Sequence, residues 1–497
     1  MSTKQIATST LWQIGSQLTM ALLSTISVKF VALGLSQELA GAYNSAYGYL
    51  QIFAILADFG LYAVSVREVS TAKDPERMIG ALIVLRSVIA TLSLGAALVI
   101  AWSIPAWAAS PLRVGITIAA FVPFFTLLSG VLRTVFQVRY KMHLVFVAEV
   151  TQRIITAGLM AVIILMGIRG SDATRVYEYF LWVGSVGAVV LFILSVIFAT
   201  RTMRIRLCFD RDLLGYLLRK AMPYGVAFLC IALYRQFDLT MIALLREDYK
   251  IQNALYGFAS RISEMTYLIP TFLLNSTLPV LSDRHDRGQQ TAPLLGKTLF
   301  IILILGSTSA LFSLFWARPI MRLLTTTAYL STPGHPGADT ALRLLAAPMF
   351  LNGIVLFSFY TLLTKHEWKG LVGRMMIAVV LSIGLNLYLI PKSGFIGATE
   401  TSTVVQFFLA ATLLPVALRV LPASFPLAYV IRWIVFSALL AGALFVSAPL
   451  LESLPATVIG LAVAVVALPL LALLLGFHTI LDMKLRPEAM DMPGAAG

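Results

Sequence analysis

Nine charged side chains lie inside apolar stretches of the sequence that are long enough to cross a bilayer. They are Lys29, Asp58, Arg86, Glu149, Arg153, Arg235, Asp238, Arg261 and Glu264. An ion at the bilayer centre costs on the order of 3 kcal/mol on insertion scales, so we expect these groups to face one another or water. A guanidinium matches two phosphate oxygens with its fork of donors, and a carboxylate can carry a coupling proton or ion. The pattern indicates either structural ion pairs or a polar pathway.

The densest group of charges lies on two neighbouring stretches. Arg235 and Asp238 are three residues apart on one stretch, and Arg261 and Glu264 are three residues apart on the next. Residues three apart share a helix face. Because the two helices would run antiparallel, we expect Asp238 to lie near Arg261 and Arg235 to lie near Glu264. These helices are predicted to form the walls of a transport pathway; the alternative is that the four charges lock the helices together.

The other charges allow similar pairs. Asp58 and Arg86 would lie roughly 12 and 10 Å from the same membrane surface, at about 1.5 Å per helical residue, so they could meet. Glu149 and Arg153 have the spacing and order of a local helical pair. Lys29 has no acid at its own depth in its helix, and the alternative to a binding role is that it reaches the outer interface.

Pro270 lies within the second of the two charged stretches, six residues after Glu264. Proline removes a backbone donor, which predicts a kink or hinge beside the charged residues. The alternative is a proline that neighbouring helices accommodate without motion.

The composition identifies an integral membrane protein. Of 497 residues, 59% are hydrophobic and 12% are charged, and the mean hydropathy is +0.89. Soluble domains are about half apolar and about a quarter charged. The net charge of +14 is therefore a sign of topology, not of nucleic-acid binding. The two cysteines and the histidines have no spacing typical of a metal site, and no metal or cofactor is predicted.

Taking about 20 apolar residues per crossing predicts an all-α polytopic protein with fourteen spans. They lie near 11–33, 43–66, 79–104, 112–132, 144–168, 177–199, 221–245, 254–280, 298–317, 341–364, 371–390, 395–417, 427–450 and 455–480. Of 37 Lys and Arg residues, 23 fall in loops on the side of the N-terminus and 9 on the opposite side. Both termini are therefore expected in the cytoplasm.

The spans group into four predicted regions. An N-terminal six-helix lobe takes 1–200, a basic cytoplasmic linker takes 201–220, and a second six-helix lobe takes 221–420. Two additional helices and a cytoplasmic tail take 421–497. We expect the linker cations to lie at the lipid surface, the alternative being a regulatory or partner-binding role.

Three motifs carry a resemblance. The sequence LGLSQELAGAYNSAYGYLQIFAILADFGL occupies 33–61. RQFDLTMIALL followed by ALYGFASRISEMTYLIPTFLLNSTLPVLS falls within 235–282, and NLYLIPKSGFIGATETSTVVQFF occupies 386–408. In order and position, they resemble bacterial polysaccharide translocases, the lipid-linked oligosaccharide (O-antigen) flippases of the multidrug/oligosaccharidyl-lipid/polysaccharide exporter superfamily. One departure is Arg235, because many relatives have no cation before the Asp of the seventh span.

The resemblance implies two six-helix lobes around a central cavity and alternating access. It implies that a polyprenyl-diphosphate-linked oligosaccharide moves from the cytoplasmic to the periplasmic leaflet of the bacterial inner membrane, for lipopolysaccharide or exopolysaccharide synthesis. The implied partners are this glycolipid, membrane lipids, and a polysaccharide polymerase and glycosyltransferases, with no nucleic acid.

On this interpretation each charged residue takes a role. The expected ligands of the diphosphate are Lys29, Arg86, Arg235 and Arg261. The residues expected to couple an ion or to form pairs are Asp58, Asp238, Glu264, Glu149 and Arg153. Pro270 is the expected hinge.

Two alternatives stay open. A multidrug exporter of the same superfamily would favour an acid-dominated cavity, and the five intramembrane cations argue against it. A membrane glycosyltransferase or polymerase would need a sizeable extracytoplasmic site with acidic or His/Arg groups, which the short loops lack. The sequence also has no G-x-x-x-x-G-K-[ST] motif, so nothing indicates ATP hydrolysis, and we expect no enzymatic activity.

Overall fold

A computed structural model of the chain describes residues 3–166, 173–268, 270–271, 273–274, 277, 281, 291–364, 368–423 and 427–477. The predicted cytoplasmic tail beyond 477 and most of the second half of the predicted span 254–280 lie outside the described residues. Within these ranges the chain is helical apart from short turns and one isolated bridge between Thr332 and His335.

The N-terminal half contains α1 to α8. Their bounds are α1 Thr3–Gly34, α2 Gln37–Asp58, α3 Leu61–Thr71, α4 Pro75–Ser103, α5 Leu112–Ala119, α6 Phe121–Val138, α7 Met142–Leu165 and α8 Ala173–Thr202, with the 3-10 turn η1 at Pro105–Trp107.

The C-terminal half contains the later helices. Their bounds are α9 Arg211–Gln236, α10 Asp238–Leu245, α11 Tyr249–Thr266, α13 Ala292–Phe315, α14 Ala317–Leu324, α15 Ala338–Leu344, α16 Ala346–Thr364, α17 Trp368–Ser393, α18 Phe395–Val420, α19 Leu427–Ser447 and α20 Leu454–Leu474, with 3-10 turns η3 Thr327–Tyr329 and η4 Ala448–Leu450.

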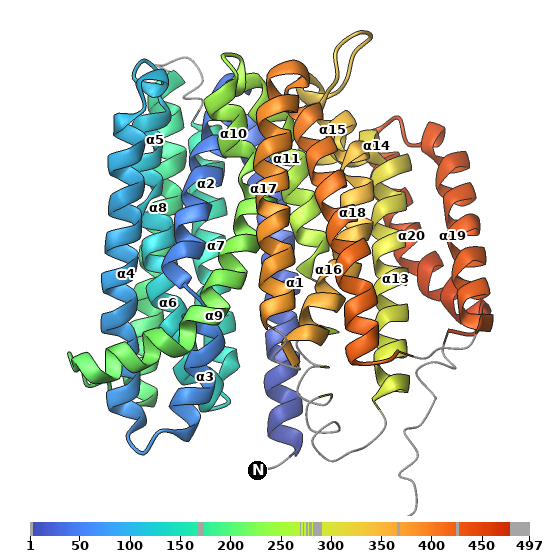
Figure 1. Cartoon of the computed structure of the whole chain (residues 1–497). Coiled ribbons are helices and arrows are strands. Elements are labelled where there is room, and N and C mark those ends of the chain that lie inside the picture. The colour runs from blue at the N-terminus through green and yellow to red at the C-terminus, as the bar shows by residue number, and fades with distance from the viewer. Residues whose placement is uncertain are drawn as a thin grey trace, which may run out of the picture.

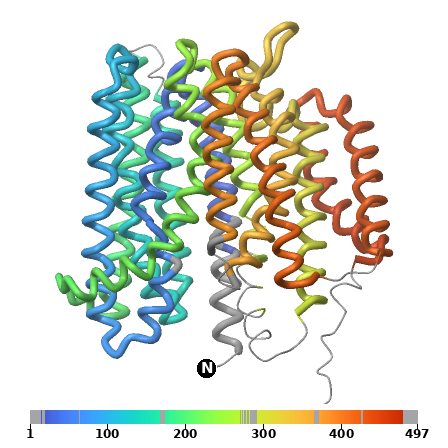
Figure 2. The backbone as a smooth tube through the Cα atoms, viewed as in Figure 1, coloured from blue at the N-terminus to red at the C-terminus, as the bar shows by residue number. Residues whose placement is uncertain are grey.

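The helices run roughly parallel to one axis and form two groups side by side (Figure 1). The blue to teal helices α2 to α8 lie on one side, and the yellow and orange helices α13 to α18 lie on the other. The red helices α19 and α20 lie at the outer edge (Figure 2). Helix α19 packs on α13 and α20 packs on α14, within a separate apolar cluster that includes Phe300, Trp316 and Phe436.

The chain is a multi-pass membrane protein. Among the described residues, eleven helical segments are long and apolar enough to cross a membrane. The predicted spans near 11–33, 43–66 and 254–280 are not among the eleven, so fourteen crossings stay a prediction. These spans correspond to α1, whose apolar stretch is the shorter Thr19–Gly34, and to α2 and α11, which carry several polar residues. Because α2 and α11 pack against each other, polar residues at their contact such as Asn44, Ser45 and Asn253 are buried.

Three of the predicted spans are interrupted. The second breaks between α2 and α3, where Phe59 and Gly60 both have positive φ (41° and 70°). Glycine accepts this conformation without strain. The seventh breaks at Phe237, so Asp238 becomes the first residue of α10, where a carboxylate interacts favourably with the helix dipole. The eighth is interrupted after Thr266, the residue whose carbonyl clashes with the ring of Pro270 in a regular helix.

Helix α9 begins inside the predicted linker. The Asp210 carboxylate accepts hydrogen bonds from the amides of Asp212 and Leu213 at 3.0 and 3.2 Å, so the helix starts at Arg211. The predicted linker 201–220 is therefore non-helical only over 203–210. The green lower part of α9 runs across the foot of the molecule before the helix rises toward α10 (Figure 1).

Candidate functional site

A small polar cavity of ≈ 70 Å³ lies between the two halves, at the break between α9 and α10. Its walls include all four charged residues predicted on the seventh and eighth spans: Arg235, Asp238, Arg261 and Glu264. The N-terminal half contributes α2 to the wall, through residues such as Tyr47. The charged side chains of the two stretches therefore surround one small polar space.

Asp238 lines this cavity and is buried, with 1% of its surface exposed. Its carboxylate accepts hydrogen bonds from Tyr256 Oη at 2.8 Å, Asn386 Nδ2 at 2.9 Å and Ser402 Oγ at 3.0 Å. These donors come from α11, α17 and α18. The expected nearness to Arg261 is seen only as a shared cavity, because the hydrogen-bond partners of the carboxylate are neutral groups. A buried carboxylate held by neutral donors is suited to gain and lose a proton or a small cation.

The two arginines of the cavity keep much of their binding capacity. Arg235 places its guanidinium 4.4 Å from the centre of the Tyr267 ring. Arg261 Nη1 lies 4.0 Å from Glu264 Oε2, and the two side chains are 41% and 40% exposed. A contact of this length between half-exposed groups is weak. Both guanidiniums are therefore available to an anionic ligand in the cavity.

A larger and mainly apolar cavity of ≈ 480 Å³ adjoins the polar one. The two share Tyr47 and Gln51 of α2. The larger cavity extends along α2 to Asp58 and is also lined by α6 and by Phe228 and Ile231 of α9. The site thus combines a small charged cavity with a larger apolar one. A ligand with an anionic group and a bulky uncharged part matches this combination.

The halves are sealed against each other where α2 meets α11. Asn44 Nδ2 donates to the Asn253 carbonyl at 3.1 Å, and Asn253 Nδ2 donates to Ser45 Oγ at 2.8 Å. A Cβ atom at Gly41 would overlap the Lys250 carbonyl oxygen, so only glycine fits there. This seal lies at the N-terminal end of α2, the end of the molecule opposite the foot of α9 (Figure 1).

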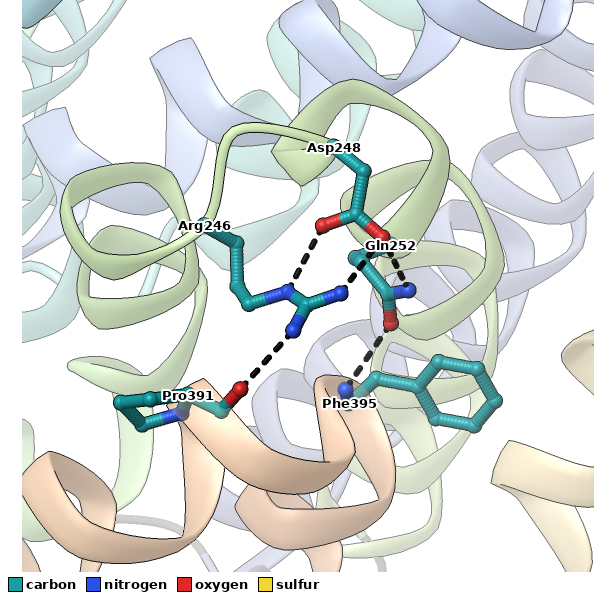
Figure 3. Close-up of polar contacts among 5 residues, drawn as sticks. All are labelled: Arg246, Asp248, Gln252, Pro391 and Phe395. Atoms are coloured by element: carbon teal, nitrogen blue, oxygen red, sulfur yellow. Dashed lines mark hydrogen bonds and ion pairs between the residues drawn. The ribbon is translucent and has the colours of Figure 1, made fainter.

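A polar network supports the seal from the C-terminal half (Figure 3). Arg246 Nε and Nη2 donate to the two Asp248 carboxylate oxygens at 2.7 and 2.9 Å, and Nη1 donates to the Pro391 carbonyl at 2.9 Å. Gln252 donates to Asp248 at 2.9 Å and accepts from the Phe395 amide at 3.0 Å. The hydrogen bonds from Arg246 lower the pKa of Asp248. The network joins the loop before α11 to the turn between α17 and α18.

Arg86 and Asp58 meet as predicted. Arg86 Nη2 lies 2.5 Å from Asp58 Oδ1, Nη1 donates to the Asp58 carbonyl at 3.1 Å, and Nε donates to the Leu127 carbonyl at 3.4 Å. Only 3% of Arg86 is exposed, and Asp58 is the last residue of α2. Arg86 therefore holds the broken end of α2 against α4 and α6, and its donors are directed at the protein.

We expect Arg86→Met to lower stability by about 3 kcal/mol, because it leaves the Asp58 carboxylate in the bundle without its cation. A thermal melt of the purified full chain measures this. The double variant Arg86→Met/Asp58→Asn should recover part of the loss, since it removes both charges. A double variant less stable than Arg86→Met alone would contradict this role.

The predicted local pair of Glu149 and Arg153 is replaced by a pair between helices. Glu149 Oε1 lies 2.9 Å from Arg133 Nη1 of α6. Within the described ranges no carboxylate forms an ion pair with Arg153, and its Nε is buried without a hydrogen-bond partner. Arg153 lies within electrostatic range of Arg261 in the other half and of Glu149 on its own helix. Arg153 is thus a buried cation near Arg261 whose Nε makes no hydrogen bond within the described part of the chain.

Lys29 lies away from the polar cavity. Its Nζ donates to the backbone carbonyls of Thr325 and, at 3.5 Å, of Arg322. These carbonyls end α14, where a positive charge is favourable for the helix dipole. Lys29 thus connects α1 to α14 through backbone carbonyls. The sequence did not predict this contact, because it offers no acid beside Lys29 and gives no sign of backbone partners.

Sequence reasoning missed the neutral partners of Asp238. Tyr256 lies in the motif within 235–282, and Asn386 and Ser402 lie in the motif at 386–408. A buried Tyr, Asn or Ser is common in helices, so the sequence alone does not mark these side chains as ligands of an acid.

Comparisons with known proteins agree on the fold. A family model described as "Polysaccharide biosynthesis protein" matches residues 6–285. No curated protein matches the sequence. The structure of the lipid II flippase MurJ in an inward closed conformation is similar, with a TM-score of 0.67 and 15% identity, over 96% of this chain and 100% of that one.

Multidrug transporters also share the fold. An inward-facing MATE family transporter of the MOP superfamily has a TM-score of 0.58 and 13% identity, over 82% of this chain and 97% of that one. The MATE multidrug transporter DinF-BH has a TM-score of 0.58 and 14% identity, over 85% of this chain and 97% of that one. The chain therefore shares its fold with a flippase and with transporters.

Proposed function

Because this chain belongs to the polysaccharide biosynthesis protein family, we propose that it is a flippase for a polyprenyl-diphosphate-linked oligosaccharide. It moves this lipid from the cytoplasmic to the periplasmic leaflet of the bacterial inner membrane, with both termini in the cytoplasm. The lobes at 1–200 and 221–420 rock about the cavity, and the break before Pro270 acts as a hinge. The product serves surface polysaccharide synthesis, in which glycosyltransferases make the cargo and a polymerase consumes it.

The observation that carries this proposal is the pairing of a charged cavity with a larger apolar one. Arg235 and Arg261 offer guanidinium donors to the diphosphate, and Arg153 adds a third cation from the other half. The ≈ 480 Å³ apolar cavity next to them has room for part of the uncharged remainder of the ligand. Arg86 and Lys29 serve the structure around the site instead, since protein oxygens accept their hydrogen bonds.

A flippase-null strain tests the proposal. Expression of the chain should restore surface polysaccharide, and purified protein in vesicles should move a fluorescent polyprenyl-diphosphate glycan across the bilayer. Protein that inserts and folds but gives neither result would contradict the proposal.

A multidrug exporter is the second candidate, because the chain shares its fold with MATE multidrug transporters. The two carboxylates of the cavity, Asp238 and Glu264, are the groups that a cationic drug would require. Two arginines in the same wall oppose such a ligand. Export of organic cations by vesicles that do not move the glycolipid would favour this candidate.

Coupling is proposed to run through Asp238. Asp238→Asn keeps the size of the side chain but removes the group that takes up a proton or sodium ion. We expect stimulation of transport by a proton or sodium gradient to disappear, leaving the rate measured without a gradient. Asp339→Asn is the matched control, because Asp339 is also buried (2% exposed) but lies beside α14, outside the cavity. Unchanged stimulation in Asp238→Asn would remove this residue from coupling.

A further inference from the structure

The segment that joins α8 to α9 exposes apolar and cationic side chains together. Leu207 is 70% exposed and Phe209 is 68% exposed. Arg204, Arg211 and Arg219 are exposed as well, and the described part of the chain provides no ion pair for any of the three. Large apolar groups beside unpaired cations are typical of a surface that meets anionic lipid.

This exposure occurs on a segment that is held firmly to the protein. Arg77 Nη2 lies 2.7 Å from Asp210 Oδ2, and Arg206 Nε lies 3.3 Å from Glu76 Oε2. A Cβ atom at Gly80 would overlap the Arg206 carbonyl oxygen, so the backbone runs directly against α4. Leu207 and Phe209 are thus displayed by a fixed backbone.

The first turns of α9 continue the same surface. Lys220 Nζ donates to Glu68 Oε1 at 2.8 Å, and Tyr216 Oη donates to Glu68 Oε2 at 2.9 Å, which fastens α9 to α3. Beside these contacts is a groove lined by Arg211, Asp212, Tyr216, Arg219 and Lys220. Cations outnumber acids in this groove, so it favours an anion.

The position of the segment matches the headgroup layer. Helix α8 has 30 residues, about 45 Å at 1.5 Å per residue, which exceeds the hydrocarbon thickness of about 30 Å. The helix therefore extends beyond the hydrocarbon, and the exposed Arg201 in its last turn indicates that the Thr202 end does so. The lower part of α9 then runs across the foot of the molecule, at a steep angle to the spanning helices (Figure 1).

We propose that residues 203–222 form a binding surface for anionic phospholipid. Leu207 and Phe209 enter the boundary between headgroups and acyl chains, and Arg204, Arg211 and Arg219 bind the lipid phosphates. This surface lies outside the transport cavities, so the proposal does not rest on the identity of the cargo.

Lipid retention by the full-length purified chain tests the proposal. Native mass spectrometry would compare bound phosphatidylglycerol with bound phosphatidylcholine in wild type and in Arg204→Gln/Arg211→Gln/Arg219→Gln. Each cation near an anionic surface contributes about fivefold, so the triple variant should lose about a hundredfold in affinity for phosphatidylglycerol. The control Arg67→Gln/Arg139→Gln/Lys141→Gln removes the same charge from exposed positions of neighbouring helices and loops and should retain the lipid.

A second variant addresses the apolar part. Leu207→Ser/Phe209→Ser should weaken retention of both lipids while leaving the preference for phosphatidylglycerol and its salt dependence intact. A melting curve of each variant is needed to check that it is folded. Three outcomes would each overturn the proposal. The two triple variants could lose lipid equally, wild type could retain the two lipids equally, or millimolar inorganic phosphate could displace phosphatidylglycerol. Unchanged lipid retention with loss of cellular function would point to a partner protein on this surface instead.

Discussion

Substitution of Arg261 by alanine should stop glycolipid transport while the protein still inserts and folds. Arg261 is the half-exposed guanidinium of the polar cavity, and its nearest carboxylate is 4.0 Å away. A hydrogen bond to a charged group contributes about 1.5–3 kcal/mol, so loss of the contact should weaken diphosphate binding about 10- to 100-fold. Transport of a fluorescent polyprenyl-diphosphate glycan into vesicles measures the effect.

Two further variants define what Arg261 supplies. Arg261→Lys keeps the charge but loses the fork of donors, so it should retain partial activity. Arg343→Ala, which removes an exposed arginine on α15 outside the cavity, is the matched control and should transport normally. Normal transport by Arg261→Ala would exclude the residue from the binding site.

The second large effect is expected at the seal between α2 and α11. Gly41→Ala places a Cβ atom where it overlaps the Lys250 carbonyl oxygen, so the two helices cannot close. Overpacking of this kind costs about 2 kcal/mol, which changes the ratio of closed to open molecules about 30-fold. Transport should fall because the cycle requires both states.

The open state of Gly41→Ala can be detected by thiol labelling. Gln51 lies in both cavities, so Gln51→Cys in a chain with Cys208 and Cys230 replaced reports access from outside. A membrane-impermeant reagent added on the periplasmic side should label this cysteine faster in the Gly41→Ala background. Gly95→Ala is the control, because a Cβ at Gly95 would meet no atom within 4 Å. Equal labelling in both backgrounds would show that the contact is not a gate.

The grouping of charges on α9 to α11 could be predicted from the sequence. Helical spacing predicts Arg235 and Asp238 on one face and antiparallel neighbours bring Arg261 and Glu264 to the same place, and all four meet although the break at Phe237 puts Arg235 on α9 and Asp238 on α10. The cost of ions in a bilayer then requires a polar cavity. The structure has one, lined by all four residues.

The partners of the charges could not be predicted, because they come from distant helices. Asp238 accepts from Asn386, which is 148 residues away. Glu149 pairs with Arg133, which the sequence placed in a loop but which lies on α6. Local spacing indicates which residues share a helix face, whereas tertiary packing decides between a near partner such as Arg153 and one on a neighbouring helix.

One of the helix breaks could be predicted from the sequence, and another could not. Pro270 predicts the interruption after Thr266 because its ring has a known steric effect. The break at Phe59 has no such local signal, since a phenylalanine with positive φ requires tertiary support. Arg86 provides part of it by binding the adjacent end of α2.

The most direct measurement asks whether the charged groups surround a wet site that holds the diphosphate. Ser260 lines the polar cavity beside Arg261, so Ser260→Cys in the cysteine-free chain places a thiol there. We predict that a membrane-impermeant reagent labels this thiol in vesicles and that a polyprenyl-diphosphate glycan protects it, whereas the same lipid without phosphate does not. A thiol that stays unlabelled from both sides of the membrane, or one that the glycolipid fails to protect, would contradict the proposed pathway.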